Sequence, residues 1–373
     1  MSNGYLYYKT DKDVFDALHS QKFSKAKIIQ QLKDRGILVS SEDEKDDLIE
    51  YVSPLFLNYH DQRFIIDTLN KQSNRKTFTT TKISANLLNG NEKIDTKEFI
   101  ANLVQDIKKN RETNHSEIID IHRNQDGSYV VKSSYTEADY SKSVMSQNLT
   151  QTVEFKIWED DEGLISVRAS NSNKTAQLLN EITDEVRKID KSADKYLIEL
   201  SAFPDSSIRN EFFFTLLESL EGFENINVKS IYTANINEAN ISEEGELLPH
   251  VNRLDLNGNA VTNSKRFQDL KSEGYYITKI EWSSNKAMYK GEKVEFLAEF
   301  KDHKNCNNFL YAPLRIFKAK DNGDYNLTPS DMLPSVQADL LSILEKGAIS
   351  SHKKITAKYS NGENSTTPIT NSE

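Results

Sequence analysis

The sequence predicts an α+β protein of several domains. Apolar residues recur at helical spacing in the first hundred positions, and the spacing shortens towards two after about residue 115. Strand-like and helical segments then alternate, which is typical of mixed folds. The length of 373 residues corresponds to two or three domains of about 150 residues each. We expect a helical domain (1–90), a mixed α+β domain (91–240), a small sheet-plus-helix domain (241–349) and a disordered tail (350–373).

Four helices are predicted in the first part of the chain. Gly36 follows the first helix as a natural C′ residue, because glycine adopts positive φ without a Cβ clash. The second helix stops before Pro54, whose ring disfavours helical backbone in the residue before it. The predicted ranges are 24–35, about 46–52, 59–71 and 96–110.

Two β-hairpins are predicted next. Residues 117–122 and 128–134 flank Asp126-Gly127, which is a strong hairpin turn signal. Residues 152–158 and 164–169 flank an acidic turn. The segments expected after them are a helix at 174–189, a strand at 195–201, a helix at 206–221 and a strand at 227–234.

The last third of the chain combines a loop, three strands and two helices. Its Asn-, Glu- and Gly-rich composition predicts a boundary loop over 237–263. Pro313 makes the last strand an edge strand or a bulged one, because proline cannot donate a hydrogen bond to a neighbouring strand. The predicted elements are a helix at 264–273, strands at 275–283, 292–301 and 309–318, and a helix at 329–346.

Composition limits the classes of protein that fit. The formal net charge of −10 opposes general affinity for polyanions, which favours a protein–protein scaffold. Cys306 is the single cysteine, so neither an internal disulfide nor a cysteine-based zinc site is expected. No stretch approaches the roughly 18 apolar residues that span a bilayer, and the first residues lack a signal-peptide pattern. We therefore expect a cytoplasmic protein that makes no membrane contact.

Residues 23–52 carry two short helical patterns around an extended loop. This segment resembles the SAP and related helix–extended loop–helix families. The matching residues are Leu32, Lys33, Arg35, Gly36, Ile37, Lys45, Leu48 and Ile49. The resemblance implies nucleic-acid contact through the second helix, the loop, and Lys33, Arg35 and Lys45. The acidic residues at 42–44, 46 and 47 depart from the pattern and would repel phosphate, so the alternative is a helix pair that only packs.

The segment from Lys265 to Lys320 is locally basic. It holds 12 basic residues against 7 acidic ones, within a chain of net charge −10. Interleaved aromatic residues are one way to hold single-stranded nucleic acid by stacking, but alternation places Phe296 and Phe300 on a core face. We therefore expect most of these aromatics in the core. The candidate phosphate contacts are Lys279, Lys293, Lys301, Arg315 and Lys318.

A nuclease is the first alternative. Glu299 and Lys301 share one face of a strand, which is similar to half of the PD-(D/E)xK nuclease pattern and suits a metal-bound carboxylate beside a lysine. Glu281 is the available carboxylate on the neighbouring strand. A second Glu-x-Lys joins Glu154 to Lys156, with Asp120 or Asp126 upstream. The other interpretation of both pairs is cross-strand charge pairing on a solvent face.

No other chemical motif stands out in the sequence. Gly-rich phosphate loops, a His-Glu-x-x-His helix and a Gly-x-Ser-x-Gly elbow do not occur. No metal site is predicted, and no cofactor beyond Mg²⁺ in the nuclease alternative. The leading interpretation is a non-enzymatic nucleic-acid- or protein-binding component of a cytosolic assembly. In general character the chain resembles accessory proteins of bacterial anti-phage defence systems.

Overall fold

The computed structural model confirms the α+β class. It describes residues 9–70, 76–85, 88–89, 92–112, 117–141, 145, 147–241, 247–258, 265–287 and 291–360. The helices are α1 (Asp11–Leu18), α2 (Lys25–Asp34), α3 (Lys45–Val52), α4 (Tyr59–Asn70), α5 (Thr96–Glu112), α6 (Thr175–Ile189), α7 (Ser206–Glu218), α8 (Lys265–Ser272) and α9 (Pro334–Ser360). The strands are β1 (Phe78–Ser84), β2 (Leu88–Asn89), β3 (Glu92–Lys93), β4 (Glu117–Arg123), β5 (Tyr129–Ala138), β6 (Asn148–Glu159), β7 (Ile165–Ser170), β8 (Asp194–Tyr196), β9 (Phe223–Ile241), β10 (Leu247–Gly258), β11 (Tyr276–Lys286), β12 (Lys293–Asp302) and β13 (Asn307–Phe317).

The chain forms two compact units that are not contiguous in sequence. Unit 1 holds residues 1–74, 104–123 and 130–154, and unit 2 holds residues 75–103, 124–129 and 155–373. Strand β6 passes from one unit to the other, and its second half pairs with β7 inside unit 2. The predicted division into domains at about residues 90, 240 and 349 stays a prediction.

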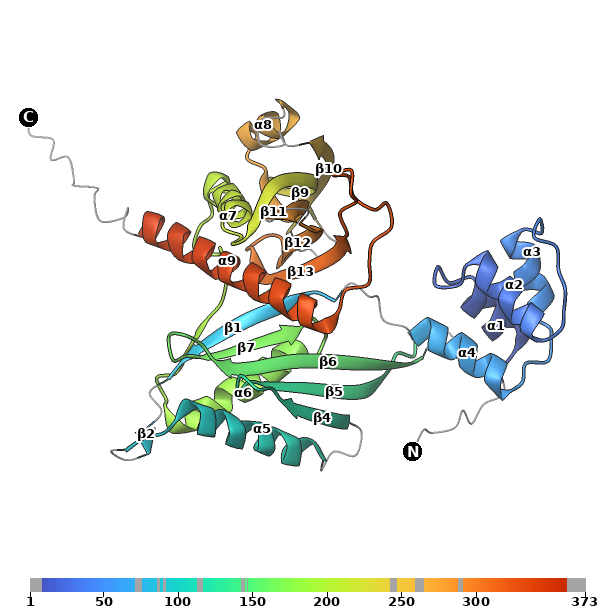
Figure 1. The fold of residues 1–373 in the computed structure, drawn as a ribbon, viewed down its shortest axis with the longest axis horizontal. Helices are drawn as coiled ribbons and strands as arrows, with labels where there is room; N and C mark the ends of the chain where they lie inside the picture. Colours follow the sequence, from blue (N-terminus) through green and yellow to red (C-terminus); the bar gives the residue numbers. More distant parts are fainter. Residues whose placement is uncertain are drawn as a thin grey trace, which may run out of the picture. The chain divides into compact units, whose positions relative to one another are not determined.

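Helices α1 to α4 form a bundle within unit 1 (Figure 1). Ile28, Leu32 and Ile49 are buried in its core, as their helical spacing predicts. Helix α2 ends at Asp34, and Gly36 follows its C-cap residue with a φ of +77°. Ile37 donates its N–H to the Leu32 carbonyl at 2.9 Å. This hydrogen bond and positive φ form a Schellman motif, so Gly36 is the C′ residue that the sequence predicts.

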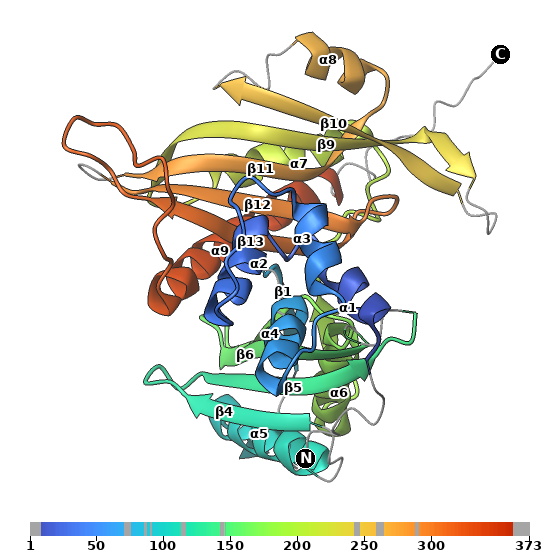
Figure 2. The ribbon, with the colours of Figure 1, turned by 90° about the vertical axis from the view of Figure 1, so that its right-hand side faces the viewer.

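Unit 2 is built around one antiparallel sheet. Its strands pair in the order β10-β9-β11-β12-β13-β1-β7-β6, and β8 pairs with β1. Helices α7 and α9 pack together against one face of β11 and β13 (Figures 1 and 2). Between these helices and the sheet lies an aromatic core that includes Phe212, Trp282, Phe296 and Phe300. The described aromatics of the basic segment are buried, so they stabilise the fold.

Three predicted elements differ from the structure. Residues 237–263 are not a loop throughout, because β9 continues to Ile241 and pairs with β10. Helix α9 runs to Ser360, so part of the predicted tail is helical, because Ile349 and Ile355 continue its buried face. Strand β8 is only three residues long. Residues 361–373 of the predicted tail lie outside the described residues.

Pro313 lies in an internal strand and not at a sheet edge. Strand β13 pairs with β12 on one side and with β1 on the other. The register shifts between Glu295, which faces Arg315, and Phe296, which faces Pro313, so one extra residue bulges at this point. A bulge accommodates the missing N–H of proline, so the bulged alternative of the prediction is correct.

The order of elements repeats along the chain. A helix, antiparallel strands and a closing helix occur as α5, β4–β7 and α6, and again as α7, β9–β13 and α9. The first set of strands pairs in the order β7-β6-β5-β4 and the second in the order β13-β12-β11-β9, with β10 and α8 inserted. This duplicated connectivity is not visible as a repeat of residues in the sequence.

Candidate nucleic-acid interface

The face of the unit 2 sheet opposite α7 and α9 is lined by charged side chains. Along β12, Val294, Phe296 and Phe300 point into the core, so the residues between them point to the opposite face. We call this surface the charged face. Its charged members are Lys229 of β9, Lys279 and Glu281 of β11, Lys293, Glu295, Glu299 and Lys301 of β12, and Arg315 of β13.

Glu295 joins three strands of the charged face through ion pairs. Its side chain is 3% exposed, it binds the Lys229 ammonium, and it accepts a hydrogen bond from Arg315 Nε at 2.6 Å. The Lys229 and Arg315 side chains remain 38% and 43% exposed. Two cations surround one buried carboxylate, so this group keeps a positive charge next to solvent. Sequence reasoning missed Lys229, which lies outside the segment selected for its basic composition.

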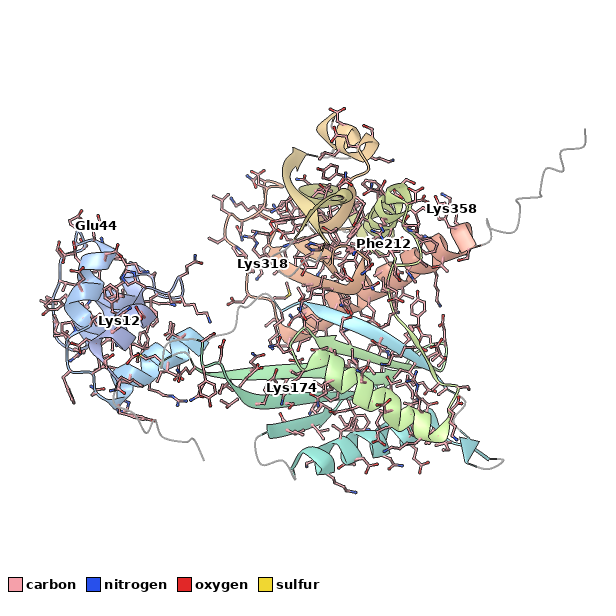
Figure 3. The ribbon with its side chains drawn as sticks, turned by 180° about the vertical axis from the view of Figure 1, so that it is seen from behind. Lys12, Glu44, Lys174, Phe212, Lys318 and Lys358 are labelled. Carbon is pink, nitrogen blue, oxygen red and sulfur yellow. The ribbon has the colours of Figure 1, made fainter. Side chains whose placement is uncertain are left out.

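Lys293 and Lys318 extend this positive charge. The Lys293 ammonium lies 4.8 Å from the centre of the Phe317 ring and 4.9 Å from that of Tyr325. Such cation–π contacts leave the positive charge of the ammonium uncompensated. Lys318 is exposed and follows Phe317 directly at the end of β13 (Figure 3). We call Lys229, Lys293 and Arg315, together with Lys318 directly after β13, the basic end of the charged face.

The other end of the charged face is acidic. Lys279 Nζ lies 3.1 Å from a Glu281 oxygen, 3.9 Å from a Glu299 oxygen and 4.8 Å from the centre of the Tyr232 ring. The Lys279 ammonium therefore forms ion pairs with both carboxylates, which outnumber it. Lys301 is exposed on the same face as Glu299, two residues away along β12.

The predicted nuclease residues share this acidic end. Glu299 and Glu281 lie on adjacent antiparallel strands, with Lys279 directly opposite Glu299. Burial lowers the pKa of nearby His303, although Glu299 and Asp302 oppose that shift. Among the described residues, no group of three or more His, Cys, Asp or Glu side chains could hold a metal ion. The two carboxylates are arranged as partners of a lysine.

The second Glu-x-Lys pair has a structural partner as well. Lys156 Nζ lies 3.2 Å from Asp126 at the β4–β5 turn and 5.5 Å from the centre of the Trp158 ring. Burial would raise the pKa of Asp126, but hydrogen bonds from Ser128 and Lys156 outweigh it and lower the pKa. This geometry is charge pairing between a strand and a turn, which is close to the alternative of cross-strand pairing that the sequence leaves open.

The three basic residues of the SAP-like segment have different surroundings. Arg35 donates a hydrogen bond from Nη2 to the Phe56 carbonyl at 2.7 Å, and its Nε lies 3.7 Å from Asp61. Lys33 is exposed near the end of α2, and Lys45 is the first residue of α3. The described helical residues 9–70 hold 9 basic and 12 acidic side chains, which gives a local charge of −3.

A buried ion pair stabilises unit 2 beneath α9. Arg168 Nη2 lies 2.6 Å from Glu345 Oε2, and both side chains are less than a tenth exposed. Thr80 and Tyr311 donate hydrogen bonds to the same oxygen at 3.1 and 3.2 Å. Burial, and then the charge of Glu345, raise the pKa of Tyr311. The network ties β1, β7 and β13 to α9. No local signal could reveal it, because its members are far apart in sequence.

No protein-family model matches the chain, and a comparison with curated proteins finds no similar sequence. The resemblance of residues 23–52 to SAP-like helix pairs therefore stays a prediction. Within the described part of the chain, no helix has the length and apolar character to cross a membrane.

Proposed function

We propose that this chain binds nucleic acid as a component of a cytosolic assembly, and that the basic end of the charged face makes the contact. The observation that supports this proposal is that Lys229 and Arg315 share the buried carboxylate of Glu295, with Lys293 two residues away along β12 and Lys318 directly after β13. Four cations at this end of the sheet attract a phosphate backbone and release its counterions on binding. The general character of the chain suggests bacterial anti-phage defence as the setting.

The proposed contact recognises the backbone and not the bases. Phe296, Phe300 and Tyr311 of this segment are buried in the core, so they offer no ring for a base to stack on. The ring of Phe317, and that of Tyr325 just after the segment, each contact the Lys293 ammonium. Phosphate contacts fix position on a strand without reading its sequence, so we expect little preference among sequences.

Glu295 has a positioning role in this proposal. Its carboxylate holds Lys229 and Arg315 from opposite sides, so the two cations are presented in fixed places. Preorganised side chains lose less conformational entropy on binding than free ones. The Glu295→Gln variant should weaken nucleic-acid binding, although it makes the surface more positive.

A binding titration tests the proposal. The probes are labelled 20-nucleotide single-stranded DNA, RNA of the same sequence and the DNA duplex, each at 50 and 200 mM salt with and without Mg²⁺. We expect binding that weakens by about 50-fold between these salt concentrations for a single strand that contacts four cations. The Lys293→Glu/Lys318→Glu variant should bind at least about 10-fold more weakly, and Lys191→Glu/Lys346→Glu is the control. These two control lysines are exposed, lie outside the charged face and produce the same change of charge.

The same titration distinguishes the alternatives. Cleavage that requires Mg²⁺ and is lost in Glu299→Ala would replace the proposal with the metal-dependent nuclease. Absence of binding at 50 mM salt would contradict it and favour the protein–protein scaffold.

A further inference from the structure

The helical bundle of unit 1 exposes large apolar side chains. Among the described residues, ten large hydrophobic side chains are exposed, and five of them lie between residues 38 and 64. Leu38, Phe56 and Tyr59 are 85%, 78% and 72% exposed. Exposed apolar side chains that gather on one region mark interaction sites more often than single ones do.

Backbone geometry directs these side chains outward. Residues 37–39 follow α2, and there Ile37 and Val39 pack on the helical core while Leu38 points away. The same alternation occurs before α4, where Leu55 and Leu57 pack inward and Phe56 points away. The exposure of Leu38 and Phe56 is therefore set by well-packed neighbours in the chain.

Arg35 brings the two exposed segments together. It lies three residues before Leu38 and donates a hydrogen bond to the Phe56 carbonyl at 2.7 Å. Asp61, at the start of α4, lies 3.7 Å from the same guanidinium. The Asn58 and Asp61 side chains each accept a hydrogen bond from the other residue's backbone N–H, at 2.9 and 3.2 Å. This network holds the turn that carries Phe56 and Tyr59. We call Leu38, Phe56 and Tyr59 the apolar patch.

The charge of the bundle selects the kind of partner. Five acidic residues surround the beginning of α3, and Figure 3 labels one of them, Glu44. The others are Glu42, Asp43, Asp46 and Asp47. Arg35, which donates a hydrogen bond to the Phe56 carbonyl, also forms an ion pair with Asp61. These carboxylates, which begin four residues after Leu38, repel phosphate and favour a partner that is basic as well as apolar.

We infer that the apolar patch docks a basic amphipathic segment of another protein. Apolar side chains of that segment would cover Leu38 and Phe56, while its Lys or Arg residues would face the carboxylates before and within α3. Charge complementarity at the rim raises the rate of association, and apolar burial at the centre supplies affinity. This inference does not depend on nucleic-acid binding by the charged face.

The test uses full-length protein and a labelled 18-residue helical peptide of Leu and Lys, with Leu on one face. The wild-type protein should bind this peptide, measured by fluorescence anisotropy. The Leu38→Ser/Phe56→Ser variant should bind it at least 10-fold more weakly. The matched control is Leu327→Ser/Leu333→Ser, which removes two apolar side chains that are 93% and 63% exposed in unit 2. This control should bind as the wild type does.

A second variant tests the charge without changing the apolar patch. Glu44→Lys/Asp47→Lys should also lower the affinity for the Leu/Lys peptide. A Leu/Glu peptide of the same pattern should not bind the wild type. Nucleic-acid binding should be equal in the wild type and Leu38→Ser/Phe56→Ser, and so should the thermal midpoint, because both side chains are exposed.

Four results would overturn the inference. The first is that the wild type does not bind the Leu/Lys peptide, and the second is that Leu38→Ser/Phe56→Ser and its control weaken peptide binding equally. The third is that the wild type binds the Leu/Glu peptide as tightly as the Leu/Lys peptide, and the fourth is that the wild type self-associates and Leu38→Ser/Phe56→Ser abolishes this association. The last result would assign the patch to a second copy of the chain.

Discussion

Arg35 and Arg315 both come from segments that the sequence proposes as nucleic-acid contacts, yet their surroundings differ. The Arg35 side chain is 23% exposed, bound to Asp61 and a carbonyl, and lies in a bundle of local charge −3. The Arg315 side chain is 43% exposed and shares its carboxylate with Lys229. A basic residue is available to phosphate only where cations outnumber the carboxylates that hold them, and the basic end meets that condition.

Arg168 is the most buried of the three arginines compared, with a side chain that is 8% exposed. Removal of its partner Glu345 should therefore lower stability more than any other change proposed. In Glu345→Ala the buried guanidinium keeps its place without a carboxylate, so the free energy of unfolding should fall by about 3–5 kcal/mol. Chemical denaturation monitored by circular dichroism measures this change. Glu345→Gln should lower the free energy of unfolding by less, because the amide oxygen still accepts hydrogen bonds. An equal loss in both variants would show that the charge of Glu345 does not account for the stabilisation.

Arg35 should behave as a residue that stabilises the bundle. Arg35→Ala leaves Asp61 buried without its cation and frees the Phe56 carbonyl, so we expect a loss of about 1–3 kcal/mol. Lys33→Ala, at an exposed position, should change stability by less than about 0.5 kcal/mol. If Lys33→Glu lowers nucleic-acid affinity as much as Lys293→Glu does, the comparison between the two regions fails.

The two ends of the charged face provide a narrower test. Lys293→Glu should lower affinity for single-stranded DNA by about 10-fold, because it removes one phosphate contact and adds repulsion. Lys279→Glu should have a smaller effect on affinity, since Lys279 is already held by Glu281 and Glu299. Parallel titrations of the two variants with single-stranded DNA at 50 mM salt show which one loses more affinity.

The smallest expected effect concerns His352, a buried histidine of α9. His352 bonds Tyr196 at 2.7 Å and the Glu199 carbonyl at 2.8 Å, and burial lowers its pKa although that carbonyl opposes the shift. Because the pKa of His352 is lower in the folded chain than in the unfolded chain, protonation favours unfolding. The contribution of neutral His352 to the free energy of unfolding is therefore fully present above about pH 6.5 and is lost as the pH falls below that value. The loss at pH 5.5 should be at most about 1.4 kcal/mol. His352→Gln should reduce this pH dependence, measured as the difference between denaturation midpoints at pH 7.5 and 5.5.

Local patterns predicted most elements of the fold. The spacing of Ile28 and Leu32 located α2, and Asp126-Gly127 located the first hairpin turn, because both signals act within a few residues. The hairpin of β9 and β10 was missed, since its Asn- and Glu-rich composition is typical of loops. Its pairing arises from strands that meet in the folded sheet, which is a tertiary effect.

The candidate site was less predictable than the fold. Strand alternation placed Glu299 and Lys301 on one face and sent Phe296 and Phe300 to the core. It did not reveal that Lys279 lies between two carboxylates, or that Lys229 joins the basic end from a distant strand. Strand order decides these partners, and a single sequence does not contain it in any local pattern.

The salt dependence of single-stranded DNA binding tests the central claim most directly. If the four cations of the basic end contact phosphates, log affinity should fall against log salt with a slope of about −2.8. Lys293→Glu/Lys318→Glu should reduce that slope to about −1.4, and Lys191→Glu/Lys346→Glu should leave it unchanged. Equal slopes in the wild type and in both variants would contradict the assignment of nucleic-acid binding to this surface.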